Sequence, residues 1–96
     1  MRPSVALELY RTTIKEAAER RGLLNPRVFG SVARGTDRED SDLDILVTPP
    51  KGNGLLKMSG FLYELSTKLP VEVHVTSDRN IPIDVRDKIL AEAKAI

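Results

Sequence analysis

Two aspartates separated by one residue are the clearest candidates for chemistry in this sequence. Asp42 and Asp44 flank Leu43 at the start of an apolar run over residues 43–47. Side chains at positions i and i+2 of a strand share a face, so both carboxylates are expected to point one way and the apolar residues the other. Such close carboxylates repel unless a cation separates them, and oxygen ligands of this kind suit Mg²⁺. For the pair alone, a solvated acidic strand end is the more ordinary explanation.

A third acidic residue follows about thirty positions later. Residues 71–75 alternate as Val-Glu-Val-His-Val, which predicts a strand with Glu72 and His74 on one face. If this strand neighbours the first, Glu72 supplies a third carboxylate, and three are enough for two divalent ions bridging a nucleophile and a triphosphate. Taken alone, Glu72 is better explained as a cross-strand partner of a Lys or Arg on an exposed face. We interpret His74 as a structural or peripheral residue.

Gly30 and Ser31 form a candidate anion-binding turn. They follow the short apolar run Val28-Phe29, and a glycine there allows the backbone to approach a ligand closely. Ser31 offers a hydroxyl, and Arg34 lies one turn further along the chain. A Gly-Ser pair alone predicts an ordinary turn, so the argument depends on its spacing from the aspartates.

Helical and extended patterns alternate along the chain and place these residues. Ser4 is a candidate cap for a first helix that ends near Arg21 before Gly22. A second helix with apolar residues every three or four positions ends at Pro70. The full expected order is helix 4–21, strand 28–29, turn or short helix 31–35, strand 43–47, helix 55–69, strand 71–75, and a last helix from about 82 with an inner face reaching Ile96. This order predicts an α/β (α+β) fold: a small mixed sheet of at least three strands flanked by helices.

Length and composition narrow the classes of protein. Ninety-six residues predict a single domain, 1–96. There is no cysteine, which excludes disulfides, thiol nucleophiles and Cys-based zinc sites. The formal net charge of +1 and the 4% aromatic content argue against strong nucleic-acid binding. No apolar run approaches membrane-spanning length and no signal peptide is visible, so we expect no membrane association and a cytoplasmic location.

The joint spacing of these motifs resembles a known superfamily. Ten residues separate Ser31 from Asp42. The segments Val-Phe-Gly-Ser-Val-Ala-Arg-Gly (28–35) and Ser-Asp-Leu-Asp-Ile-Leu-Val (41–47) resemble the Gly-Ser and Asp-x-Asp motifs of the DNA polymerase β-type nucleotidyltransferases. The residues within these motifs are most similar to those of the minimal nucleotidyltransferases (MNT), the antitoxin halves of HEPN–MNT toxin–antitoxin pairs.

The resemblance implies roles for individual residues. Gly30 and Ser31 would bind the β- and γ-phosphates of a nucleoside triphosphate, and Asp42 and Asp44 would hold two Mg²⁺ or Mn²⁺ ions. Glu72 stands where the family commonly has a third Asp, and its extra methylene is a departure that affects the rate more than the binding. Arg34 matches the arginine of the motif.

The resemblance also implies a reaction and a partner. The expected activity is Mg²⁺-dependent transfer of AMP from ATP to a hydroxyl, that of a tyrosine, on a HEPN RNase toxin, a small helical protein. Two alternatives stay open: a non-covalent antitoxin with weak or vestigial catalysis, and a catalytic subunit that modifies a small molecule. We expect the partner, or self-association in its absence, to cover apolar residues of the second long helix: Leu55, Leu56, Phe61 and Tyr63.

Overall fold

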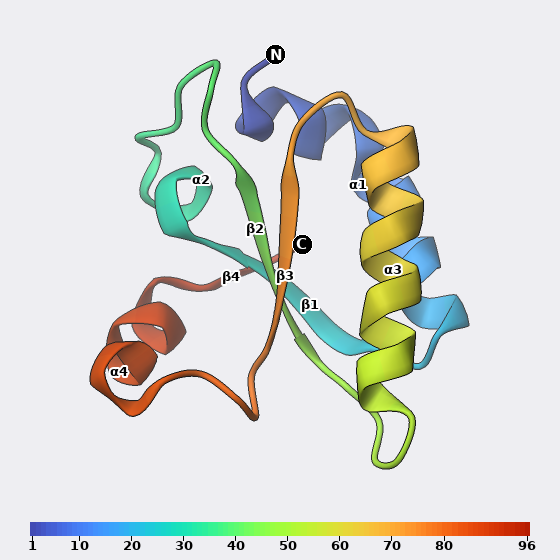
Figure 1. Ribbon diagram of the computed structural model, residues 1–96. Helices are drawn as coiled ribbons and strands as arrows, with labels where there is room; N and C mark the ends of the chain where they lie inside the picture. The colour runs from blue at the N-terminus through green and yellow to red at the C-terminus, as the bar shows by residue number, and fades with distance from the viewer.

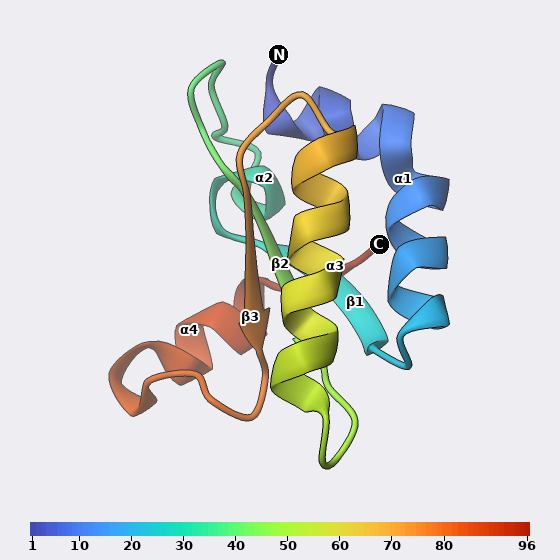
Figure 2. The ribbon, with the colours of Figure 1, turned by 45° about the vertical axis from the view of Figure 1, so that its right-hand side comes forward.

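The chain forms a four-stranded sheet flanked by helices, and the computed structural model describes all 96 residues. Helices α1 and α3 lie together on one side of the sheet, and α4 lies on the other (Figures 1 and 2). None of the helices is long and apolar enough to cross a membrane. The predicted α/β class is confirmed. The elements in chain order are α1 (Pro3–Arg20), β1 (Leu24–Phe29), α2 (Gly30–Arg34), β2 (Leu43–Thr48), α3 (Gly54–Lys68), β3 (Val73–Ser77), α4 (Ile83–Glu92) and β4 (Lys94–Ala95).

The sheet is mixed, with the strand order β3-β2-β1-β4. Strand β2 pairs antiparallel with β1 and parallel with β3, while β4 pairs antiparallel with β1. A parallel pair needs a long crossover connection, and α3 provides it between β2 and β3. Because β2 lies between β1 and β3, the residues at its start have neighbours on both sides.

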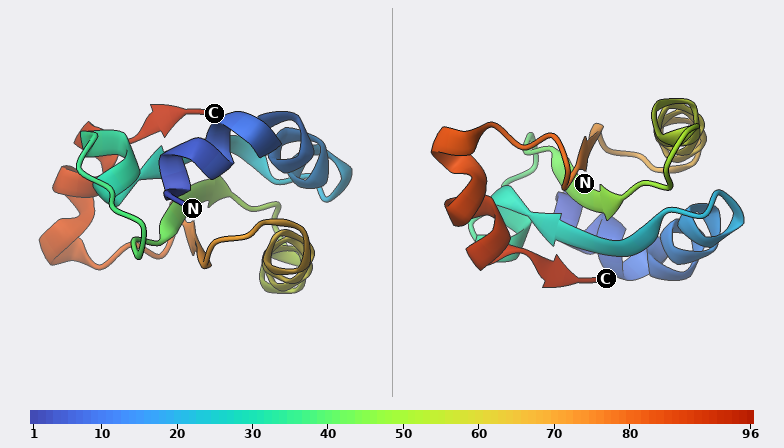
Figure 3. Two further views of the ribbon diagram at one scale, coloured as in Figure 1. Left: turned by 90° about the horizontal axis from the view of Figure 1, so that it is seen from above. Right: turned by 90° about the horizontal axis from the view of Figure 1, so that it is seen from below.

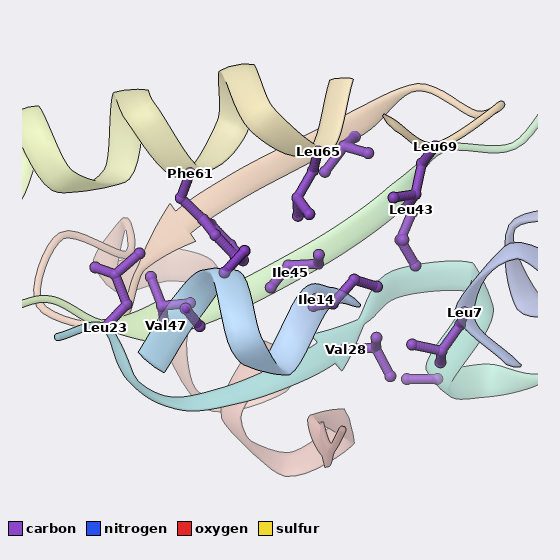
Figure 4. Packing of buried hydrophobic residues seen from close by; sticks show 14 residues of the cluster. Leu7, Ile14, Leu23, Val28, Leu43, Ile45, Val47, Phe61, Leu65 and Leu69 are labelled. Carbon is purple, nitrogen blue, oxygen red and sulfur yellow. The ribbon is translucent and has the colours of Figure 1, made fainter. Parts of the chain in front are cut away.

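The apolar side of β2 forms the centre of the core. Leu43, Ile45 and Val47 are fully buried and face α1 and α3, as Figure 4 shows. Strict alternation along β2 therefore leaves the intervening residues on the opposite face. The main apolar cluster contains Leu7, Ile14, Ala17, Ala18, Leu23, Val28, Ala33, Leu43, Ile45, Val47, Phe61, Leu65, Leu69 and Val73.

The first helix begins and ends almost where the sequence indicates, but its cap is different. Ser4 lies inside the helix, so the expectation that it caps the helix is wrong. The carboxylate of Asp37 replaces it, because it accepts a hydrogen bond from the Ser4 N–H at 2.9 Å and is paired with Arg2. The loop after α2 therefore holds the start of α1. The predicted end is confirmed: Gly22 follows the helix with φ +68°.

One prediction for the second long helix, α3, is wrong. Phe61 was expected among exposed docking residues, but it is 0% exposed and points into the core. It lies one turn before Leu65 and shares its buried face, which positions four apart in a helix must do. Leu55, Leu56 and Tyr63 are exposed as expected.

The end of the chain also differs from the prediction. A helix was expected to continue to Ile96, but α4 ends at Glu92 and residues 94–95 form the strand β4. This strand pairs with Arg27 and Val28 of β1, whose outer edge would otherwise lack a partner. Helix α4 itself has no buried residue, so its expected inner face is not part of the core.

Two strand boundaries move as well. Strand β1 begins at Leu24, four residues before the predicted start, with a register irregularity between Leu24 and Arg27. Strand β3 spans Val73–Ser77, so Glu72 lies just before it. The ladder still reaches this residue, because the Leu43 N–H donates to the Glu72 carbonyl at 2.9 Å.

Candidate active site

Asp42 and Asp44 lie at the start of β2, on the face opposite the core. The three alternate residues of β2 that point inward are buried, and Asp42 and Asp44 are only partly exposed. Their position follows from the alternation of the strand, as the sequence predicted. The sheet therefore presents two neighbouring carboxylates at the N-terminal end of β2, beside the N-terminal end of its parallel neighbour β3.

Strand β3 brings Glu72 and His74 to the aspartates. In the parallel register, Asp44 stands opposite His74. His74 Nε2 lies 3.3 Å from Glu72 Oε1 and 3.7 Å from Asp42 Oδ2, and His74 Nδ1 lies 3.7 Å from Asp44 Oδ1. Glu72 is 72% exposed, so it lies on the open side of the group. The structure thus gathers all three predicted carboxylates around one imidazole.

The contacts of His74 differ from the expectation of a structural or peripheral residue. It has a ring nitrogen within 4 Å of each of the three carboxylates, whereas its ring is half exposed and packs in no core. The signal in the sequence is its spacing from Glu72: residues two apart in a strand share a face. Any residue at this position therefore lies beside the acidic group.

Gly30 allows the turn after β1 to approach Asp44 closely. Its φ is +70°, and a Cβ atom at this position would collide with the Asp44 carboxylate. Helix α2 begins here, so the segment predicted as a turn or short helix is a helix of five residues. The hydroxyl of Ser31, the next residue, makes no hydrogen bond within the protein. Helix α2 ends at Arg34, and Gly35 follows it with a φ of +75°.

Arg34 faces this turn, but its partner comes from the far end of the chain. Its Nη1 donates to Glu92 Oε2 at 2.9 Å, and the same oxygen accepts the Gly30 N–H at 2.8 Å. Sequence reasoning missed Glu92, because the contact joins positions about sixty apart and depends on β4 pairing with β1. No signal in the sequence marks it, because the last helix was expected to continue past Glu92 to Ile96.

The electrostatics of the site are those of crowded carboxylates. Burial raises the pKa of Asp44 above its usual value, and the neighbouring charges of Asp42 and Glu92 raise it further. His74 and Arg34 act in the opposite direction but do not cancel the effect. Without a cation nearby, the ionised form of Asp44 is therefore disfavoured. A bound cation would favour that ionised form.

Oxygen and imidazole donors are close enough here to fit a divalent cation. One ligand atom each from Asp42, Glu72 and His74 lie within 4.8 Å of one another. Asp42 and Glu72 also line a small polar hollow of about 190 Å³. Larger hollows lie elsewhere, one beside α1 and one beside the start of α3, and they do not include these residues. At the site itself, Glu72 and His74 are exposed to solvent.

A sheet of this topology with paired aspartates beside a Gly-Ser turn defines a class of transferase, and the sequence matches it. The chain belongs to the nucleotidyltransferase domain family, whose profile matches residues 11–96. A protein of Methanocaldococcus jannaschii provisionally named a protein adenylyltransferase is 40% identical over 72 residues, which are 75% of this chain and 77% of that protein. The protein adenylyltransferase MntA of Thermococcus cleftensis is 35% identical over 78 residues, 81% of this chain and 79% of its own length.

Solved structures agree with this assignment. A structure described provisionally as a minimal nucleotidyltransferase superposes with a TM-score of 0.80 at 38% identity, covering 97% of this chain and 93% of that one. A crystal structure of a toxin–antitoxin with AMP-PNP superposes with a TM-score of 0.73, covering 88% of this chain and 69% of its own. At 20% identity, the second match shows a shared fold. The family predicted from the Gly-Ser and Asp-x-Asp spacing is confirmed.

Proposed function

We propose that this protein transfers AMP from ATP to a hydroxyl group of a partner protein, with Asp42, Asp44 and Glu72 as its metal-holding carboxylates. The observation that carries the proposal is the arrangement of these carboxylates. Two come from the start of β2 and one from the residue before β3, all three lie around His74, and Asp44 also contacts Gly30.

The donor set fits Mg²⁺ or Mn²⁺. Carboxylate oxygens from Asp42, Asp44 and Glu72 are hard ligands of the kind that both ions prefer, and His74 adds a nitrogen that suits Mn²⁺ better than Mg²⁺. Two such ions, when bound, neutralise the charge of the triphosphate and of the attacking oxygen. The raised pKa of Asp44 supports the proposal, since the carboxylate is disfavoured as an anion until positive charge is near.

Gly30, Ser31 and Arg34 are the proposed phosphate-binding residues. The Ser31 hydroxyl has no partner within the protein, so it is free to donate to a phosphate oxygen. Gly30 has no Cβ, so a phosphate can lie against its backbone and still be next to Asp44. The Arg34 guanidinium faces the same place. Their part in the reaction is to hold the β- and γ-phosphates as the leaving group.

The proposed step is a substitution at the α-phosphorus. The acceptor oxygen forms a bond to this phosphorus, the bond to the bridging oxygen of the β-phosphate breaks, and pyrophosphate leaves. The proton of the acceptor hydroxyl passes to solvent on the open side of the site, where the exposed Glu72 and His74 lie. The protein's contribution is alignment and charge placement, which is most of what phosphoryl-type transfer requires.

A protein acceptor is consistent with the exposure of the site and with the names of the relatives. The hollow beside Asp42 and Glu72 is too small to enclose an acceptor, so the acceptor must approach from outside. Both curated relatives are named protein adenylyltransferases, and a similar fold occurs in a toxin–antitoxin structure. We infer that the partner is a toxin, a HEPN-type RNase, modified on a tyrosine, and that this chain acts as its antitoxin.

The test is the mass of the partner after incubation with this protein, ATP and Mg²⁺. A HEPN-type toxin that binds this protein is expected to gain one or more AMP units with the wild type and none with the Asp42→Asn/Asp44→Asn double variant. The double variant should still bind the partner. If the wild type gives no mass increase and the double variant neutralises the partner equally well, the protein acts by occlusion and the covalent proposal is wrong.

A further inference from the structure

The carboxylate of Glu92 rests on two of the groups that we assign to the nucleotide phosphates. A single oxygen, Oε2, accepts both the Gly30 N–H at 2.8 Å and the Arg34 guanidinium at 2.9 Å. The Glu92 side chain is only 14% exposed. Helix α4, which carries it, lies beside α2 in both views of Figure 3. An anionic group of the chain itself therefore takes up donors that a phosphate oxygen would use.

The position of Glu92 is not explained by the stability of its own helix. It is the last residue of α4, and a negative charge at a helix C-terminus is unfavourable. No basic residue lies in the last turn of α4 to compensate. The contacts with Gly30 and Arg34 are the only side-chain hydrogen bonds between α4 and the rest of the protein. These contacts, rather than the helix, keep the carboxylate where it is.

A bound triphosphate and Glu92 compete for the same space and charge. Glu92 adds a fourth carboxylate to those of Asp42, Asp44 and Glu72, and its charge already acts on Asp44. A phosphate oxygen on the Gly30 N–H would lie at the place of Glu92 Oε2, and two anions in contact repel strongly where water is partly excluded. Both cannot hold these donors at once.

We propose that Glu92 is an internal substitute for a nucleotide phosphate group. In the nucleotide-free protein it holds Gly30 and Arg34, and a nucleoside triphosphate displaces it on binding. Glu92 therefore lowers the resting affinity for nucleotide, and loading the site removes the polar anchor of α4. This inference rests on the proposed nucleotide chemistry of the site and adds a regulatory element to it.

The test is equilibrium binding of two ligands in the presence of Mg²⁺: a non-hydrolysable ATP analogue and inorganic tripolyphosphate. Glu92→Gln keeps an acceptor for the Gly30 N–H but removes the charge, and Glu92→Ala removes both. Both variants should bind both ligands more tightly than the wild type, by about tenfold for Glu92→Gln. Asp87→Asn is the matched control, because it removes a charge from the exposed side of α4, and its affinity should stay within about twofold of the wild type.

Other results overturn the inference in distinguishable ways. Weaker or unchanged binding by either Glu92 variant, with circular dichroism unchanged, would mean that Glu92 positions Gly30 and Arg34 for the nucleotide instead. A gain for the ATP analogue without a gain for tripolyphosphate would place Glu92 away from the phosphates. If neither the wild type nor the variants bind either ligand, the proposed nucleotide function itself fails.

Discussion

At the scale of single residues, Gly30 carries the sharpest steric constraint in the site. Gly30 has a φ of +70° and Gly22 a similar φ of +68°, but the atoms around the two residues differ. A Cβ at Gly30 would meet the Asp44 carboxylate, whereas a Cβ at Gly22 would meet nothing within 4 Å. The two glycines therefore separate the cost of backbone strain from the cost of disturbing the site.

We expect Gly30→Ala to lose nucleotide binding and Gly22→Ala to keep it. Each substitution should destabilise the fold by about 1 kcal/mol through backbone strain, and Gly30→Ala by more because Asp44 must move. Urea unfolding measures the stability, and titration with Mg²⁺ and an ATP analogue measures the binding. Equal nucleotide affinity in the two variants would show that close approach at Gly30 is not needed.

Asp44→Asn should abolish transfer while making the metal-free protein more stable. The pKa of Asp44 is raised in the folded protein, mainly by burial, so its ionised form opposes folding at neutral pH. Removing the charge removes that penalty, and we expect the melting temperature at pH 7 to rise by a few degrees. The advantage should disappear as the pH falls through the raised pKa, because the wild-type carboxyl then becomes neutral too.

The control for this prediction is Asp40→Asn, in the exposed loop before β2. It should change neither the melting temperature nor the activity. An Asp44→Asn variant that melts below the wild type at pH 7 would contradict the argument from burial and charge crowding.

The residues that could be predicted from the sequence are those whose positions follow from local rules. Alternation along β2 fixes the face of Asp42 and Asp44, and the same rule puts Glu72 and His74 together. Glu92 could not be predicted, because its contact requires β4 to pair with β1 and α4 to lie against α2. The contacts of His74 could be predicted only in part, because its neighbours come from two strands rather than one.

At the scale of elements, the contact between α1 and α3 depends on one acidic residue. Glu64 of α3 is buried and accepts hydrogen bonds from Arg20 at the end of α1, from Arg21, which follows it, and from Lys68 of its own helix, with distances of 2.6–3.1 Å. These bonds, that of Arg20 foremost, hold the pKa of Glu64 far below its usual range. The pair of helices is thus joined by a charge cluster at the side of the apolar core.

We expect Glu64→Gln to destabilise the protein by about 2 kcal/mol at pH 7. Since the folded-state pKa is depressed, the stabilisation is present above the unfolded-state value, near 4.5, and is lost as the pH falls below it. The difference in the free energy of unfolding between wild type and variant should therefore shrink from about pH 5 to about pH 2, the range over which such carboxylates titrate. Urea unfolding at several pH values across this range measures it.

Glu8→Gln provides the matched control, because Glu8 pairs with Arg11 on the exposed face of α1. Surface pairs of this type contribute about 0.5 kcal/mol or less. A Glu64→Gln variant no less stable than Glu8→Gln, or a difference from wild type that grows as the pH falls, would contradict the assigned pKa direction.

The sequence predicted helices correctly where apolar residues recur at helical spacing, and it failed at the C-terminal segment. Helices α1 and α3 have apolar residues at helical spacing, and their bounds agree closely with the sequence. The last segment failed because Ala93 and Ile96 continue the helical apolar spacing of Val85 and Ile89. The open edge of β1 offers backbone partners that a pattern in one segment does not reveal. Tertiary hydrogen bonding decided the structure there.

At the scale of the whole molecule, large apolar side chains remain exposed on α3. Leu55 and Leu56 are 81% and 71% exposed, and Tyr63 is also exposed. Leu55 and Leu56 are at the start of α3, the end of that helix opposite to the one that leads to Glu72 and β3. This arrangement is consistent with the proposed protein acceptor.

Leu55→Glu combined with Leu56→Glu should weaken partner binding at least about tenfold without destabilising the fold, because exposed substitutions of this kind usually change stability by less than about 0.5 kcal/mol. Calorimetric titration with the toxin partner measures the affinity. Leu9→Glu is the control, since Leu9 is an exposed apolar residue of α1. Undiminished binding by the double variant, or an equal loss in Leu9→Glu, would place the interface elsewhere.

The central claim is that the acidic group at the start of β2 and β3 holds a metal-bound nucleotide against the Gly30–Ser31 turn. Anomalous diffraction from crystals grown with Mn²⁺ and a non-hydrolysable ATP analogue tests it most directly. We predict Mn²⁺ peaks about 2.1 Å from carboxylate oxygens of Asp42 and Asp44, with phosphate oxygens on the turn and Glu92 moved aside. Nucleotide bound elsewhere, with no metal at the two aspartates, would contradict the account.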